Sequence, residues 1–205
     1  MTLLHGDNIT TKGNVFPEGS VNTFKGLFKD NVNLVDISKL ELPETTVEGC
    51  YSSMFQGCSK LVTAPVLPAT ELSTSCYEYM FSNCSSLEKA PELPATELVS
   101  SCYNSMFQGC SKLNLITTSF INYTNDNNEF TNWVDGVAAK GTFKYNKNAT
   151  FNPEEIRGVD GIPEGWLVKD NSVEYFYIED ISGQDNMIGI TLDNVTMYFF
   201  APQPS

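Results

Sequence analysis

The sequence predicts an α/β solenoid of about four right-handed coils, with parallel strands on one face and helical turns on the other. The main observation is a nine-residue block at residues 50–58 that returns at 76–84 and 102–110, with Cys at both ends and Met-Phe in the middle. A Leu-Pro-Ala-Thr-Glu-Leu block at residues 67–72 returns at 93–98 with the same period of 26. Repeats of 20 to 50 residues are typical of stacked units that each pack on their neighbours.

The first coil is a degraded copy of the block, at residues 23–31. Phe24 replaces Tyr51, and Asn31 replaces Cys58. A terminal repeat covers the core on one side and faces water on the other, so an atypical sequence is expected there. We therefore expect a lead-in or cap over residues 1–22 and a repeat array over residues 23–117.

Each coil is predicted to hold a short helix and a very short strand. Residues 76–81 have apolar side chains at i, i+1, i+4 and i+5, which favours one or two helical turns. Hydroxyl residues at 73–75 offer an N-cap, and Asn83 suits a left-handed C-terminal residue. Residues 87–90 indicate a strand that ends at Pro91, because proline lacks the N–H that a sheet needs.

The six cysteines occupy only two positions of the repeat, three at each. This regularity favours two columns of buried thiols over a disulfide framework, because Cys packs as a small apolar residue. A zinc site is not expected, since Cys50 and Cys58 are too far apart for a two-ligand hairpin and His5 lies outside the array.

The repeat resembles the leucine-rich repeats of BspA-like bacterial surface proteins, in particular those encoded by gut Bacteroides and their phages and prophages. The resemblance rests on a Cys-x-x-Leu-x-x-Ala segment, a Leu-Pro-x-x-x-Leu segment and the Met-Phe block. This repeat is about three residues longer than the common pattern and carries Pro65 and Pro91 in the strand region. The resemblance implies a short leucine-rich-repeat solenoid that works in recognition or adhesion on a bacterial surface or a phage particle.

Residues 118–168 are expected to form a C-terminal α+β cap, as the corresponding segment does in the family that the repeat resembles. We predict a helix over residues 130–137 that ends at Gly136, a strand over 141–145, and a Pro-Gly turn over 162–165 followed by a strand. Trp133 and Trp166 are interpreted as apolar plugs over the end of the core, with sugar stacking as the alternative.

Residues 169–205 are predicted to form a β-rich extension with strands at 173–178, 187–192 and 195–200. The first strand is apolar on both faces, so we expect the cap or another chain to bury it. We interpret the extension as a device for homo-oligomer or virion assembly, and a plain sheet packed on the cap as the alternative. The candidate assembly residues are Tyr175, Phe176, Tyr177, Ile178, Tyr198, Phe199 and Phe200.

Charge and motifs exclude several classes of function. A net charge of −13 disfavours nucleic acid and anionic membranes as partners. No apolar run is long enough to span a bilayer, and the first residues do not resemble a signal peptide. Phosphate-loop, hydrolase and metalloprotease motifs are missing, and the polar run at residues 125–129 is interpreted as a loop rather than a calcium site. We therefore expect a non-enzymatic protein without cofactor or metal.

The surface is then the expected functional element. The outward strand positions differ between the copies, and the concave sheet is the usual recognition face of leucine-rich repeats. The candidate contacts with a protein or glycan on a cell surface are Val62, Thr63, Val66, Glu88, Lys89, Glu92, Asn114 and Leu115. Two alternatives remain: a structural head or tail subunit of a virion, and a fragment of an exported surface lipoprotein. The expected location is a virion, the cell surface or the extracellular space.

Overall fold

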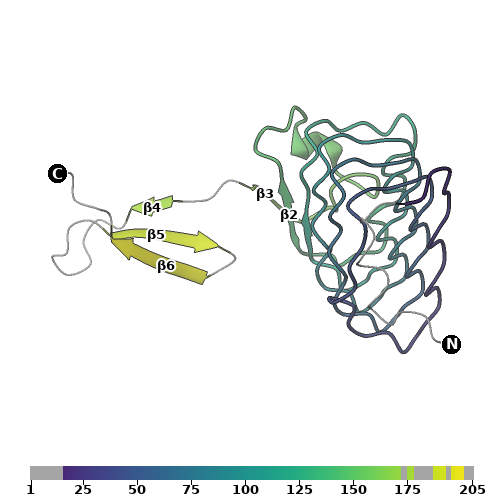
Figure 1. Ribbon diagram of the computed structural model, residues 1–205. Coiled ribbons are helices and arrows are strands. Elements are labelled where there is room, and N and C mark those ends of the chain that lie inside the picture. The colour runs from purple at the N-terminus through teal and green to yellow at the C-terminus, as the bar shows by residue number, and fades with distance from the viewer. Residues whose placement is uncertain (1–15, 172–174, 178–186, 193–194, 201–205) are drawn as a thin grey trace. The chain divides into compact units, whose positions relative to one another are not determined.

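The computed structural model describes residues 16–171, 175–177, 187–192 and 195–200, with side chains described in the first of these ranges. The chain divides into two compact units, residues 1–170 and residues 171–205 (Figure 1). Each unit is described by itself below.

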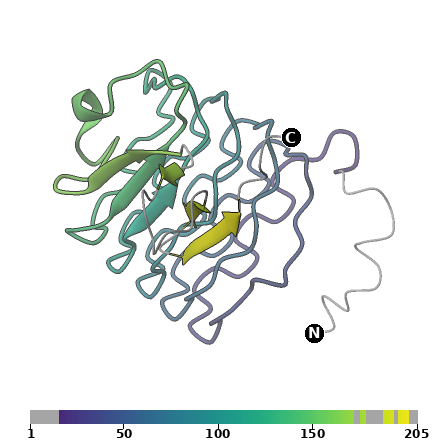
Figure 2. The same ribbon diagram turned by 90° about the vertical axis from the view of Figure 1, so that its left-hand side faces the viewer.

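The first unit is a stack of coils that lie side by side (Figures 1 and 2). Backbone hydrogen bonds join the nine-residue blocks of neighbouring coils at a spacing of 25 or 26 residues. The N–H of Tyr51 donates to the Cys76 carbonyl at 3.0 Å, and that of Tyr77 donates to the Cys102 carbonyl at 3.2 Å. The sequence period therefore equals one coil of the stack.

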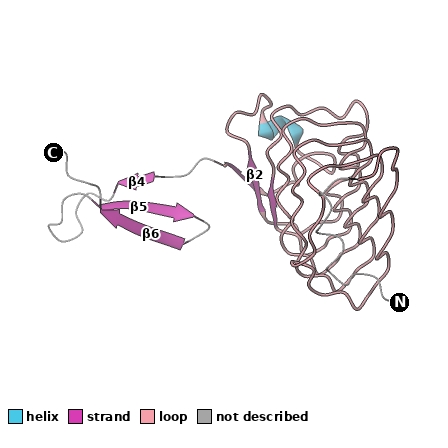
Figure 3. Ribbon diagram, viewed as in Figure 1, coloured by secondary structure: helices cyan, strands magenta, loops and turns pink. Residues whose placement is uncertain are grey.

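The predicted helical turns are wrong. The described residues contain no α-helix, and the one helical element is a short 3-10 helix, η1 (Pro153–Ile156), seen in Figure 3. The nine-residue block instead lies in a run of consecutive β-turns, here called the turn ribbon. Its ten-residue copies are residues 22–31, 49–58, 75–84, 101–110 and 128–137.

Backbone N–H groups alternate in direction along the turn ribbon. Those of Ser52 and Met54 close turns within the coil, onto Gly49 and Tyr51, whereas those of Ser53 and Phe55 donate to the next coil. This pattern needs a left-handed residue at every fourth position, and φ is +61° at Gly49, +56° at Ser53 and +76° at Gly57. A right-handed helix has no such residues. The repeat of four is close to the helical period of 3.6, which explains the wrong prediction.

The helix predicted over residues 130–137 of the cap is also wrong, because these residues lie in the fifth turn ribbon. Asn132 and Gly136 have φ of +53° and +74° there, in register with the left-handed residues of the preceding coils. The array of turn ribbons therefore continues past residue 117 into the segment expected to be a separate cap.

A strand in each coil was also a wrong prediction. One parallel sheet is present, with order β1-β2-β3, formed by β1 (Leu115–Thr117), β2 (Thr142–Tyr145) and β3 (Leu167–Asp170). The earlier coils pair only through isolated bridges such as Asp36 with Thr63 and Lys89 with Leu115. Pro65 and Pro91 follow the bridged residues and have no N–H to extend the pairing. The predicted leucine-rich-repeat solenoid of helical turns and strands is thus not the fold of this chain.

Large side chains of the nine-residue block stack in columns through the stack of coils. The rings of Tyr51 and Tyr77 are 5.6 Å apart and within 8° of parallel, and those of Phe55 and Phe81 are 5.5 Å apart. All four side chains are at most 2% exposed. Equivalent side chains of successive coils lie at the same place in the core. They therefore form continuous columns, and the distance between their rings equals the spacing of the coils.

The six cysteines form two buried columns of free thiols, as predicted. In the second column, Sγ of Cys84 donates to the Phe55 carbonyl of the preceding coil at 3.1 Å. Cys58 and Cys110 make the same contact with the carbonyls of Phe28 and Phe81. The thiol thus satisfies a buried carbonyl in each coil.

The second unit is an antiparallel sheet of order β4-β5-β6, formed by β4 (Tyr175–Tyr177), β5 (Met187–Leu192) and β6 (Val195–Phe200). Strands were predicted in these three places. Ile178 lies outside the described residues, and so do the side chains of the other candidate assembly residues.

Burial of the thiols predicts that the protein loses stability in alkali. Desolvation raises the pKa of Cys50 from 9.0 to about 11 and that of Cys102 to about 12, so these thiols stay neutral in the fold when unfolded thiols ionise. Their contribution is fully present below pH 9 and is lost as the pH rises toward 11 or 12, by at most about 1.4 kcal/mol per thiol and pH unit. Thermal unfolding from pH 8 to pH 11 measures this loss of stability, and a constant melting temperature would contradict it.

Burial of the thiols also predicts that the native protein resists alkylation at pH 8, whereas the chain in denaturant is labelled at six cysteines.

Candidate recognition surface

Next to the turn ribbons, the bridged and strand segments of successive coils form a second surface, here called the ladder face. Its outward positions are Asp36, Thr63, Lys89, Leu115, Thr142 and Leu167 in successive coils. Cross-coil pairs join Asp36 to Thr63, Lys89 to Leu115, Leu115 to Thr142, and Thr142 to Leu167. Backbone hydrogen bonds therefore fix the spacing of these side chains.

The structure places all eight predicted contact residues at the surface of this region. Val62 is 47% exposed and Val66 is 70% exposed, and Leu115 is half-buried. The remaining predicted contacts are exposed: Thr63, Glu88, Lys89, Glu92 and Asn114. The inward neighbours, such as Leu61, Leu87 and Leu113, are fully buried.

The exposed residues of the ladder face change from apolar to charged along the stack. Its first coils expose valines, with Val35 at 49% beside Val62, whose N–H donates to the Val35 carbonyl at 2.8 Å. The third coil instead carries Glu88, Lys89 and Glu92. The surface thus offers an apolar region next to a charged one on a backbone of constant geometry.

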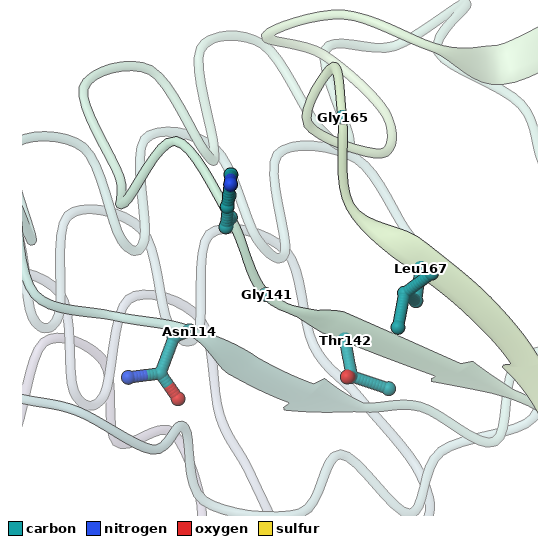
Figure 4. Close-up of a pocket in the computed structure, with 6 residues that line it drawn as sticks. Asn114, Gly141, Thr142, Gly165 and Leu167 are labelled. Carbon is teal, nitrogen blue, oxygen red and sulfur yellow. The ribbon is translucent and has the colours of Figure 1, made fainter.

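A shallow, open hollow lies at the cap end of the ladder face (Figure 4). It is lined by Asn114, Lys140, Gly141, Thr142, Gly165 and Leu167. The predicted contacts included Asn114 but not the other five, because residues 118–168 were treated as a cap outside the repeat. The signal that could have found them is the register of Thr142 and Leu167 with Leu115, which continues the outward positions of the array.

The cap positions this hollow through buried contacts. A Cβ on Gly141 would lie within 3 Å of the Asn114 carbonyl and the Trp166 ring, so only glycine lets the two coils approach here. Arg157 Nη1 donates to the carbonyls of Pro163 and Trp166 at 3.1 and 2.9 Å. These bonds hold the loop that carries Gly165 into β3.

Both tryptophans are plugs within the cap, as predicted. Trp133 and Trp166 are 1% and 2% exposed, so neither offers a ring face to a sugar. Their indole N–H groups donate to the carbonyls of Gly161 and Ala138. The tight turn before β3 is shifted by one residue from its prediction: Trp166 N–H donates to the Pro163 carbonyl, and Gly165 takes the third position, with φ of +76°.

The polar run at residues 125–129 forms a loop whose polar atoms bond to one another and to the backbone. Asn125 Oδ1 accepts from the Phe130 N–H at 2.9 Å, and the Glu129 carboxylate accepts from the Asn127 N–H at 2.9 Å. Within the described ranges, no cluster of three or more His, Cys, Asp or Glu side chains has a spacing that suits a metal ion. Within the same ranges, no helix has the length and apolar character needed to cross a membrane.

Comparison with known proteins gave no match of this chain to a protein-family model, to a curated protein or to a solved structure.

Replacement of Arg157 is predicted to loosen the hollow without unfolding the array. Arg157→Met removes the donors to the carbonyls of Pro163 and Trp166, whereas Glu154→Gln removes only the charge of an exposed ion-pair partner. We expect Arg157→Met to cost roughly 1.5–3 kcal/mol and Glu154→Gln to cost clearly less, because water screens the exposed ion pair. Urea unfolding measures both, and equal losses would show that the ion pair, not the carbonyl contacts, holds the loop.

Proposed function

We propose that the protein is a non-enzymatic recognition module that binds a protein or a glycan through its ladder face. The observation that carries this proposal is the contrast between the inward positions of each coil and the outward positions two residues further along the chain. The inward residues repeat from coil to coil, whereas the outward residues at one register are Thr63, Lys89 and Leu115. A surface whose chemistry varies on a fixed backbone is suited to specific binding.

The chemistry of the face favours a ligand with both apolar and polar groups. Val62 and Val66 offer apolar area, and Lys89 places a cation between Glu88 and Glu92 in a chain with a net charge of −13. A polyanion would be repelled by that net charge. The hollow beside Asn114 adds amide and hydroxyl groups of the kind that bind sugar hydroxyls or peptide backbone.

The place of display that we propose is a bacterial surface or a phage particle. This part of the proposal rests on the resemblance of the repeat sequence to BspA-like proteins. The place of display does not depend on the geometry of the ladder face, so either part of the proposal can be wrong while the other is right.

Charge reversal on the ladder face tests the binding proposal. Lys89→Glu is expected to reduce binding to intact host cells or to a glycan array by about tenfold or more, as loss of a central contact does. Lys25→Glu makes the same change at an exposed residue of a turn ribbon and should leave binding unchanged. Equal binding by both variants, with binding to the cells retained, would place the ligand on another surface.

An assembly role of the second unit is a second candidate function, and the register of its sheet favours it. Tyr175, Ile190 and Met197 pair across the three strands on one face, and Phe176, Gly189 and Tyr198 pair on the other. A three-stranded sheet reaches stability by itself only at the lower limit of strand number, and most residues in both paired sets are apolar in the sequence, more than one covered face would need. A virion subunit or a homo-oligomer would supply an apolar partner.

The mass in solution tests the assembly role. We expect the full chain to be an oligomer by light scattering and a chain ending at Asp170, the boundary of the first unit, to be a monomer. Replacing Ile190 by Asp in the full chain should have the same effect as the truncation. Monomers at all concentrations for the full chain would exclude self-assembly through this sheet.

A further inference from the structure

The hollow at the cap end of the ladder face is rich in hydrogen-bond donors and has no acidic lining residue. Its lining is Asn114, Lys140, Gly141, Thr142, Gly165 and Leu167, in a chain with 25 acidic residues against 12 basic ones. Lys140 brings a cation and Thr142 a hydroxyl, and the two glycines have no side chain to cover their backbone N–H groups. This is the chemistry of a site for an anionic oxygen group.

The backbone N–H groups of the two lining glycines can bond to a ligand. Within the described part of the chain, the N–H groups of Gly141 and Gly165 donate to no acceptor. A Cβ on Gly165 would lie 3.3 Å from the Ala139 carbonyl, so the Gly165 backbone lies against the segment that carries Lys140 and Gly141. Two donors and one cation therefore share a small area of the surface.

Backbone hydrogen bonds hold this area in place. The Leu167 N–H donates to the Gly141 carbonyl at 2.9 Å, and the Thr142 N–H donates to the Asn114 carbonyl at 2.8 Å. Three successive coils are thus tied together at the hollow. A site that is held in shape before binding loses little conformational entropy when a ligand enters.

Apolar surface lies directly beside the donors. Leu167 is 64% exposed, and its register partner on β2 is Thr142 (Figure 4). Asn114 adds an acceptor, because its Nδ2 donates to the Lys112 carbonyl at 3.2 Å while no described residue donates to its Oδ1. A ligand that fits carries a carboxylate, an apolar group and an N–H donor close together. The last residue of a peptide has these three groups.

We propose that the hollow binds the C-terminal carboxylate of a peptide or protein whose last residue is apolar. The carboxylate accepts from the N–H groups of Gly141 and Gly165 and lies near the Lys140 ammonium, as in other sites that capture a chain terminus with backbone donors. The last side chain packs on Leu167, and Asn114 Oδ1 accepts from a peptide N–H. The inference rests on the proposed function and names the class of ligand.

A carboxylated sugar offers the same anionic group but fits the hollow less well. None of the lining residues is aromatic, and both tryptophans are buried, so a sugar ring finds no ring face to stack on. The net charge of −13 acts against ligands with many negative charges, whereas a single carboxylate in contact with Lys140 gains from an attraction at short range. The exposed Glu164 precedes Gly165 but does not line the hollow.

Titration of the full chain with two short peptides tests the proposal, with the backbone amide signals followed by NMR. Both peptides end in Ala-Leu, one with a free carboxylate and one with a C-terminal amide. We expect the free acid to shift the amide signals of Gly141 and Gly165 and to bind about tenfold or more tightly than the amide. Lys140→Met should weaken binding of the free acid by a similar factor. Lys60→Met removes the same charge from an exposed site in an earlier coil and should leave the affinity unchanged.

Leu167→Asp provides a second variant at an exposed position, where the fold tolerates a polar side chain. It places a carboxylate beside the bound one and removes the apolar contact, so it should also weaken binding by about tenfold or more. Equal binding of the acid and the amide, or glycine signals that do not move, would overturn the proposal. So would shifts caused by glucuronic acid but not by the peptide, which would identify a sugar acid as the ligand. Loss of cell binding in Lys89→Glu reports on the ladder face separately, so a failure here leaves that proposal standing.

Discussion

The alternation of backbone N–H groups between their own coil and the next coil is the constraint on which the rest of the fold depends. A regular helix sends all its N–H groups along its own axis, and a strand sends them all to its neighbours. The turn ribbon does both in turn, with bonds of 2.7 to 3.4 Å in the two directions. The cost is a left-handed residue at every fourth position.

The need for a left-handed residue at every fourth position explains which residues occupy these positions, which core packing does not explain. Left-handed positions are occupied mostly by Gly, Ser, Asn and Asp, the residues that tolerate positive φ or bond to nearby backbone. Neighbouring coils also adjust to each other at these positions. A Cβ on Gly57 would meet the Asp30 carboxylate, and one on Gly109 would meet the Asn83 amide, so an Asx side chain in one coil is followed by glycine in the next.

The sequence predicts the period, the buried thiols and the tryptophan plugs, because these depend on side chains that recur at fixed spacing. It fails on local conformation, since apolar residues at i, i+1, i+4 and i+5 satisfy both a helix and a ribbon of four-residue turns. Glycine alone could not separate the two: Ser53 and Tyr79 are left-handed where a helix was expected. The hollow was missed for a different reason, because Thr142 and Leu167 join Leu115 only through pairing across the supposed boundary of the cap.

The same constraint supports the proposal that a ligand binds the ladder face rather than the turn ribbons. Within a ribbon, about half of the residues fill the core, and the left-handed positions admit few residue types. Tyr79 is the one bulky side chain among the described non-glycine residues of positive φ, which shows how restricted that surface is. On the ladder face, bonds through the backbone hold Lys89 beside Leu115 whatever their side chains are. Exposed side chains there can change without loss of a core contact or a left-handed residue, so a new ligand can be accommodated at little cost in stability.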